Sequence, residues 1–273
     1  MTTYGNAGDN ANISTDIGGP SLGASDIVNV LTGDVDYSTN LTALGSTAFA
    51  EFNTGPGYKG NLGNYPSALQ VPADQIVLND GGRRHAVKHY TGLTCDKLVW
   101  DNLVGGELTI ETFPTLTLFE VNAPGKIMVQ DSAIVVTARI NAGGVSVTFE
   151  EAGTALTLLE VAGTTGQASA FIERDATTVT VRKNGRVVAR ESCSPTTVNN
   201  HGGRYEHESD GALTNIAASG GAVFDFSRAR GDSSSIAWTI TGPITIIEPP
   251  LGVTIDMPTA GEKGTHRITY LAA

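Results

Sequence analysis

Residues 155–185 read ALTLLEVAGTTGQASAFIERDATTVTVRKNG, and this stretch contains one pattern twice. In each copy a run rich in Leu, Thr and Val ends on a valine, and a glycine follows four or five positions later. Similar apolar–glycine pairs recur along the chain at Trp100/Gly105, Val121/Gly125, Ile140/Gly144, Val161/Gly166, Val181/Gly185, Val198/Gly202, Ile216/Gly220 and Trp238/Gly242. Self-similarity at a period of about nineteen residues indicates a solenoid of stacked repeats.

The runs before the glycines alternate with period two. Leu159 and Val161 would point to one side of a strand and Glu160 to the other, because consecutive side chains in a strand face opposite ways. A helical solenoid would need apolar spacings of three and four, which these runs lack. Glycine suits the corners, where the chain turns through backbone angles that other residues avoid. The sequence therefore predicts an all-β, single-chain β-solenoid: a parallel β-helix of about eight rungs of about nineteen residues.

Stacked rungs bring equivalent residues about 4.8 Å apart. We expect one internal apolar column made of Val121, Ile140, Val161, Val181, Val198 and Ile216. On the outside, Glu120, Arg139 and Glu160 are predicted to stack with alternating charge, which is favourable between neighbouring strands. The glycine-to-glycine spacing varies from 17 to 22 residues, so we also expect corner loops of variable length.

Composition divides the chain into four parts. Residues 1–37 are polar and acidic, and we interpret them as an extended N-terminal arm. Residues 38–95 are predicted to cap the solenoid with a short helix over 38–52 and the first strands. The β-helix follows over 96–248. Residues 249–273 are predicted to form C-terminal strands and a tail, because two adjacent prolines begin this part and cannot lie in a central strand.

Charge and apolar runs limit the classes of partner. The formal net charge is −11, and the first 58 residues contain no Lys or Arg, which disfavours nucleic acid as a partner. No run approaches the roughly eighteen apolar residues of a membrane span. The N-terminus lacks the basic and apolar regions of a secretory signal, so we expect synthesis in the cytoplasm and no membrane partner.

The two cysteines, Cys95 and Cys193, lie four to five rungs apart. At the strand spacing this separation is about 20 Å, which is beyond the reach of a disulfide. We expect two free thiols.

Carboxylates are the first candidates for chemistry, because glycosidases place two of them about 5–10 Å apart. The candidates, several of which follow the glycine-led strands at similar phase, are Glu111, Glu150, Glu151, Glu173, Glu191, Glu206, Glu208 and Asp225. No Asp-Asp pair or carboxylate-rich rung stands out among them, and an outer polar column would show the same scatter. We therefore expect no catalytic residues and no cofactor.

Histidines are the candidate metal ligands. His85 and His89 could share a metal only in a helix, and no third ligand is evident. The rungs contain one further cluster, made of His201, Glu206, His207 and Glu208. In a strand His207 faces away from Glu206 and Glu208, so these groups cannot converge and we predict no metal site.

Arg230-Gly231-Asp232 spells the integrin-binding tripeptide. Three letters in a Gly-rich loop are adequately explained by a turn between rungs, so we do not assign adhesion to it.

The chain resembles the β-helical virion proteins of tailed bacteriophages. The resemblance rests on Val/Ile-x(3–4)-Gly rungs in runs such as LTLLEVAGTTG (156–166) and VTVRKNGRVV (179–188), on the Gly/Asn-rich N-terminal arm and on the missing signal sequence. It covers about residues 96–248 and is one of style rather than of an exact motif. The chain looks most like the head decoration, or cement, proteins that bind as trimers to the capsid lattice.

This resemblance implies a non-enzymatic role. Homotrimers would bind the major capsid protein on the exterior of the virion, bridge neighbouring capsomers and stiffen the shell, after synthesis in the host cytoplasm. In the N-terminal arm, the residues expected to contact partners are Tyr4, Ile13, Ile17, Leu22, Ile27, Val28, Val30 and Leu31.

Two other functions remain open at this point. Tail fibres and tailspikes use the same architecture and bind or cleave host surface polysaccharide, so release of reducing sugar would favour that class. A bacterial surface adhesin is the third possibility, and the missing secretion signal disfavours it.

Overall fold

The chain folds as an all-β solenoid of about eight turns built from parallel strands, which confirms the predicted fold class. This computed structural model describes the strands up to residue 100, and then residues 106–131, 133–151, 154–258 and 268–272. Within these residues there is no helix. The chain divides into two compact units, residues 1–137 and 138–273, and each is described by itself.

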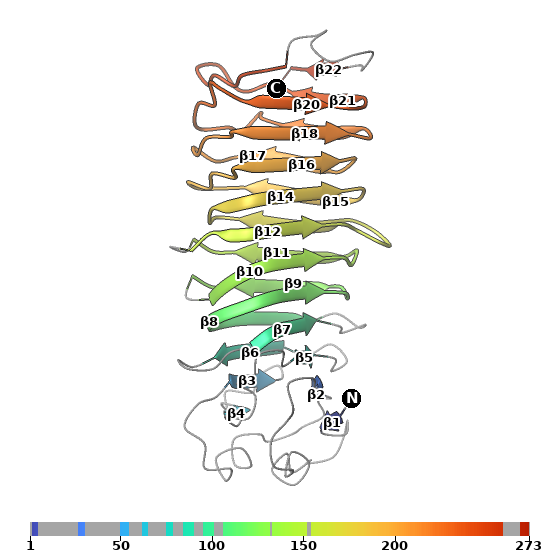
Figure 1. Ribbon diagram of the computed structural model, residues 1–273, viewed down its shortest axis with the longest axis vertical. Helices are drawn as coiled ribbons and strands as arrows, with labels where there is room; N and C mark the ends of the chain where they lie inside the picture. The colour runs from blue at the N-terminus through green and yellow to red at the C-terminus, as the bar shows by residue number, and fades with distance from the viewer. Residues whose placement is uncertain are drawn as a thin grey trace. The chain divides into compact units, whose positions relative to one another are not determined.

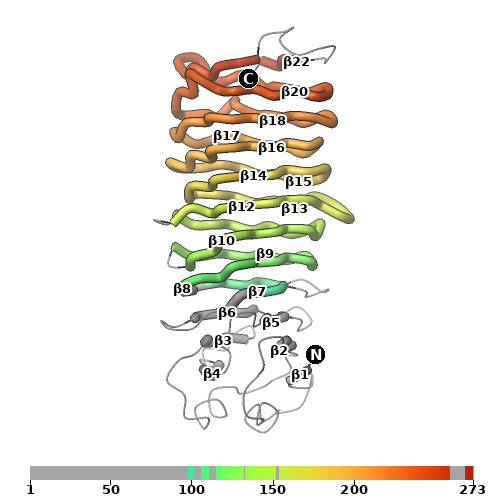
Figure 2. Tube along the Cα trace, viewed as in Figure 1, coloured from blue at the N-terminus to red at the C-terminus, as the bar shows by residue number. Residues whose placement is uncertain are grey.

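In the second unit each rung contributes one strand to each of two sheets (Figure 1). Sheet A contains β12 (Leu156–Val161), β14 (Ala176–Arg182), β16 (Thr197–His201), β18 (Asn215–Ser219) and β20 (Ala237–Ile240). Sheet B contains β11 (Val145–Phe149), β13 (Ala168–Ile172), β15 (Gly185–Ala189), β17 (Arg204–His207), β19 (Ala222–Asp225), β21 (Ile244–Ile247) and β22 (Ile268–Leu271). Each strand pairs in parallel with the next one in its sheet, and Figure 2 shows the rungs as a regular stack.

The core of this unit lies between the two sheets. Inward and outward residues alternate most regularly in β11 and β13, which each bury their first, third and fifth residues. Leu159 and Val179 are fully buried from sheet A, and Val147 and Val187 from sheet B. Burial of these aliphatic side chains stabilises the unit by about 1.5–3 kcal/mol each.

The predicted internal column is wrong at the step from Val181 to Val198. Val198 pairs with Val179 and with Ile216, whereas Val181 pairs with Asn200. Asn200 is fully buried because its amide is satisfied: it donates to the carbonyl of Val223 at 3.0 Å and accepts from the N–H of Gly203 at 2.9 Å. A polar residue therefore occupies a core position, so a search for apolar residues at the rung period could not find the partner of Val181.

Glycine forms the corners, as the sequence predicts. Gly202 and Gly220 have φ angles of 87° and 65°, in the region that side chains disfavour. A Cβ on Gly202 would also lie 2.8 Å from the carbonyl oxygen of Gly220 in the next rung. Both the backbone conformation and the close approach of the rungs explain glycine at this corner.

The first unit continues the same pairing scheme. Its sheet A contains β1 (Thr2–Tyr4), β2 (Ile27–Val30), β5 (Gln75–Leu78), β7 (Cys95–Trp100) and the second half of β8 (Glu107–Val121). Its sheet B contains β6 (Arg84–His89), the first half of β8 and β9 (Gly125–Val129). Strand β3 (Ala50–Thr54) pairs antiparallel with β6, and β4 (Leu62–Asn64) pairs antiparallel with β3. The remaining strand, β10 (Ala133–Ile140), runs across the boundary between the units.

Two boundaries of the N-terminal parts need correction. The predicted helix over 38–52 is wrong over residues 50–52, which belong to strand β3, and residues 38–49 lie outside the described part of the chain. Apolar and polar side chains alternate from Ala50 to Thr54, which is the pattern of a strand. This segment pairs antiparallel with β6. The arm predicted over 1–37 also contains two sheet strands, since Thr2–Tyr4 pairs in parallel with Ile27–Val30, which pairs in parallel with β5.

Within the described residues of the C-terminal part, 249–258 and 268–272, there is one strand, β22. Strand β21 ends just before Pro249, and β22 extends sheet B with Ile244 opposite Ile268. Between them, Ile255 forms a parallel bridge with Ser233.

Candidate functional site

Charged side chains gather on the outer face of sheet B. In β17 the side chains of Tyr205 and His207 are completely buried, whereas Arg204 and Glu206 lie on the opposite, outer face. The register places Arg204 beside Arg186 of β15 and Glu206 beside Asp225 of β19. Three consecutive rungs thus place basic and acidic groups next to one another.

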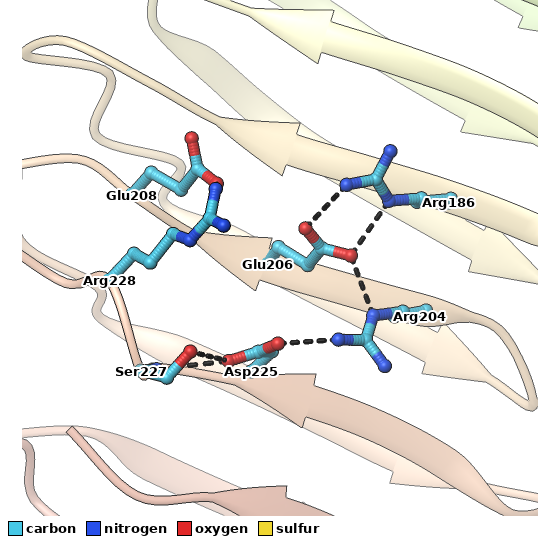
Figure 3. Close-up of a pocket in the computed structure, with 7 residues that line it drawn as sticks. All are labelled: Arg186, Arg204, Glu206, Glu208, Asp225, Ser227 and Arg228. Atoms are coloured by element: carbon cyan, nitrogen blue, oxygen red, sulfur yellow. Dashed lines mark hydrogen bonds and ion pairs between the residues drawn. The ribbon is translucent and has the colours of Figure 1, made fainter. Parts of the chain in front are cut away.

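These groups form one continuous network of hydrogen bonds (Figure 3). Arg186 donates from Nε and Nη2 to the two carboxylate oxygens of Glu206, at 2.7 Å each. Arg204 donates to Glu206 at 2.6 Å and to Asp225 at 2.5 Å. Asp225 also accepts from the backbone N–H and the hydroxyl of Ser227, at 3.0 and 2.6 Å. The network links β15, β17 and β19 through their side chains.

The arginines control the ionisation of Glu206. Burial by itself would raise the pKa of this carboxyl, but the hydrogen bonds from Arg186 and Arg204 outweigh it and hold the pKa below its usual value. In return, the hydrogen bond to Glu206 raises the pKa of Arg186. Glu206 is therefore a charged carboxylate at neutral pH.

Two neighbouring clefts open here, the first beside this face and the second along the segments that follow the strands of sheet B, and we call them the arginine–carboxylate clefts. The first has a volume of about 250 Å³ and is lined by Arg186, Arg204, Glu206, Glu208, Asp225, Ser227 and Arg228. The second has a volume of about 380 Å³ and is lined by Glu173, Arg190, Glu191, Glu208, Arg228 and Arg230. Because Glu208 and Arg228 line both, the clefts are contiguous.

The second cleft contains one carboxyl with an elevated pKa. Burial raises the pKa of Glu173, Arg190 lowers it, and the neighbouring carboxylates Glu191, Glu150 and Glu151 raise it further. Glu191 lies 3.4 Å from Arg230.

Five of the eight carboxylates singled out in the sequence are thus brought together: Glu173, Glu191, Glu206, Glu208 and Asp225. Glu150 and Glu151 lie close enough to affect Glu173, and the side chain of Glu111 lies outside the described part. Glu208 is held between Arg190 and Arg228, at 3.5 and 3.2 Å. Ion-paired carboxylates of this kind are poorly suited to general acid–base catalysis, which needs a pKa near the working pH.

His207 belongs to the core and lies apart from the clefts. Its Nε2 lies 3.0 Å from the carbonyl oxygen of Gly211, and its Nδ1 lies 3.3 Å from the hydroxyl of Tyr205. Because a carbonyl only accepts, Nε2 carries the proton and Nδ1 accepts from the tyrosine. Burial lowers the pKa of His207 to about 4, so the ring is neutral.

Other histidines and cysteines add no metal centre to the described residues. No group of three or more His, Cys, Asp or Glu is placed there to hold a metal ion. His85 and His89 lie in strand β6, where four residues span about 13 Å along the backbone. Cys193 is a buried free thiol, and burial raises its pKa. The side chain of Cys95 lies outside the described part.

The Arg230-Gly231-Asp232 tripeptide is engaged within the fold. Arg230 donates to the carbonyl oxygens of Glu208 and Glu191 at 2.8 and 3.1 Å. Asp232 accepts from the backbone N–H of Thr254 at 2.6 Å. The two side chains that an integrin would need therefore form hydrogen bonds within the chain, which agrees with the interpretation of this tripeptide as a turn between rungs.

The predicted partner-contacting residues fall partly within the described strands. Tyr4 lies in β1, and Ile27, Val28 and Val30 lie in β2. The other four, Ile13, Ile17, Leu22 and Leu31, lie outside the described part of the chain. Contact between these residues and a partner stays a prediction.

Sequence reasoning missed the arginines of the network. Arg186 and Arg204 are eighteen positions apart, about one rung, so a search for charged residues at the rung period would have paired them. It also missed Phe171, whose ring lies 4.3 Å from the Arg190 guanidinium and 5.6 Å from that of Arg186. Such cation–π contacts help to fix the positions of the guanidinium groups.

The fold and the clefts define the class: a parallel β-solenoid with a charged outer face on one of its sheets. No protein-family model, curated protein or solved structure matches this chain. A search of the described residues for helices long and apolar enough to cross a membrane finds none.

Proposed function

We propose that this chain is a non-enzymatic structural protein of a tailed-bacteriophage virion. It is a trimeric capsid decoration protein that binds the major capsid protein on the outside of the head and bridges neighbouring capsomers. The cross-bracing of consecutive rungs by the Arg186–Glu206–Arg204–Asp225 network carries this proposal.

The network favours a mechanical role for two reasons. It adds charge-assisted hydrogen bonds between β15, β17 and β19 to the backbone pairing of these strands. It also occupies the carboxylates Glu206 and Asp225 with arginine partners, which disfavours their use as a catalytic acid and base. A solenoid unit whose rungs are braced in this way is suited to strengthening a shell.

The arm supplies the proposed contact with the capsid. Strand β2 ties Ile27–Val30 to β5, so this part of the arm belongs to the body of the protein. We assign the lattice contacts chiefly to the apolar residues that precede it: Ile13, Ile17 and Leu22. Three arms per trimer allow weak individual contacts to give strong binding through multivalency.

The test measures the resistance of heads to heat. Undecorated heads of the phage that encodes this chain are mixed with saturating protein, and DNA release is followed with an intercalating dye during heating. We expect decorated heads to release DNA at a higher temperature, and the variant Ile13→Ser/Ile17→Ser/Leu22→Ser to give no protection. An identical release temperature with and without the wild-type protein would contradict the cementing role.

The alternative is a tail fibre or tailspike component that binds or cleaves host surface polysaccharide. It predicts that the protein sediments with host cells and leaves heads unprotected. Release of reducing sugar from that polysaccharide would further identify a cleaving spike.

A further inference from the structure

We propose that the two arginine–carboxylate clefts form a binding site for a neutral oligosaccharide. The proposal rests on the clefts alone and holds whether or not the chain decorates a capsid.

The first argument is the charge of the clefts. The first is lined by Arg186, Arg204 and Arg228 against Glu206, Glu208 and Asp225, so three positive groups meet three carboxylates. In the second cleft, three arginines likewise face three carboxyl groups. Both clefts are formally neutral on a chain of net charge −11. A strongly charged ligand gains no net Coulombic attraction there, and an acidic one is repelled by the chain as a whole.

The second argument is the supply of hydrogen-bonding groups. A guanidinium has five N–H donors. The side-chain network uses two from Arg186, two from Arg204 and one from Arg228, which leaves donors beside the carboxylate oxygens. Neighbouring sugar hydroxyls both donate and accept, so one pair of hydroxyls can bond to a guanidinium and a carboxylate together.

The third argument is preorganisation. The Arg186 guanidinium is fixed by two hydrogen bonds to Glu206 and by its contact with Phe171. Arg190 is fixed by Glu208 and by the same ring. Side chains that are already ordered lose little rotamer entropy when a ligand binds, which favours affinity.

The fourth argument is size. Sites for small molecules typically measure about 300–1,000 Å³. The clefts measure about 250 and 380 Å³ and are joined through Glu208 and Arg228, so together they suit a ligand of more than one sugar unit.

The experiment begins with the purified full-length protein on an array of neutral and acidic oligosaccharides. The best neutral binder is then titrated into the protein by isothermal calorimetry. Arg228→Ala is the test variant, because Arg228 lines both clefts, is 78% exposed and makes one hydrogen bond of 3.2 Å to Glu208, so the fold should tolerate its loss. Arg182→Ala is the matched control: this arginine is 54% exposed and pairs with Glu160 away from both clefts.

We expect wild-type binding to a neutral oligosaccharide, at least tenfold weaker binding by Arg228→Ala and unchanged binding by Arg182→Ala, with equal thermal unfolding of all three. Binding to acidic glycans alone would overturn the charge argument, and binding to none would overturn the site. Equal affinity of wild type and Arg228→Ala would place any binding elsewhere. Head protection is a separate assay, so failure of either proposal leaves the other intact.

Discussion

Arg186 and Glu206 are diagonal neighbours on β15 and β17, joined by two parallel hydrogen bonds of 2.7 Å. Their side chains are 29% and 11% exposed, so solvent screens the pair only in part. We expect Arg186→Ala and Glu206→Ala each to lower the free energy of unfolding by about 1.5–3 kcal/mol. In a double-mutant cycle the coupling energy should reach about 1–3 kcal/mol, measured by urea unfolding.

The control for this cycle is the pair of Arg182 and Glu160, which meet at 2.6 Å with Arg182 54% exposed. Exposed pairs contribute about 0.2–1 kcal/mol, so its coupling should be smaller. Equal coupling energies for the two pairs would show that the Arg186–Glu206 pair stabilises the fold no more than an exposed ion pair does.

His207 should make the fold sensitive to acid. Its pKa is about 4 in the folded protein against an ordinary value of 6.5, so the unfolded chain binds the proton more readily. Stability therefore falls as the pH drops from about 6.5 to 4, by about 3 kcal/mol from this residue. The measurement is urea unfolding at pH 7 and pH 4.

The variant His207→Gln removes this proton-binding group, so it should lose less stability over the same pH range than the wild type. His201→Gln, on an exposed residue of β16, is the control and should behave like the wild type. An NMR titration that finds His207 protonating near pH 6.5 in the folded state would refute the prediction.

Substitutions at two corner glycines, Gly202 and Gly221, can distinguish the cost of a steric clash from the cost of backbone strain. Gly202 has φ 87° and a Cβ there would lie 2.8 Å from the carbonyl oxygen of Gly220. Gly221 has φ 80°, and a Cβ there would meet no atom within 4 Å. Gly221→Ala should cost about 1–2 kcal/mol from the left-handed backbone alone. Gly202→Ala should cost clearly more in the same thermal unfolding experiment, and equal costs would mean that the rungs can move apart.

Cys193 should be chemically inert in the native protein. It is buried, and burial raises its pKa, so almost no reactive thiolate forms at neutral pH. In a Cys95→Ser background we expect no reaction with Ellman's reagent until denaturant is added, and then one thiol per chain. Rapid reaction under native conditions would show that this part of the core opens.

The sequence predicted the strands better than their register. Alternation around Leu159 and Val161 is a local signal, so it identified the strand and its buried face. The pairing of Val179 with Val198 was missed because Asn200, a polar residue, fills the core position opposite Val181. Asn200 accepts from the N–H of Gly203 and donates to the carbonyl oxygen of Val223, and no local pattern reveals these partners.

Strand alternation also accounts for the part of the candidate site that the sequence predicted. The alternation correctly placed His207 on the opposite face from Glu206, since this needs only the strand period. Bringing Glu206 to Arg186 required the register between rungs, which depends on the length of chain between β15 and β17, including β16 and the corners on either side of it. Carboxylates were therefore found as candidates, and their arginine partners were not.

The most direct test of the proposed function is co-sedimentation with undecorated heads, combined with the solution mass of the protein. The deletion removes β1, which pairs with β2, and ends before Ile27 so that β2 and its pairing with β5 are kept. We predict that the full chain is a trimer that pellets with heads, whereas the protein lacking residues 1–26 stays folded and remains in the supernatant. A full-length protein that ignores heads, or a truncated one that still pellets with them, would contradict the account.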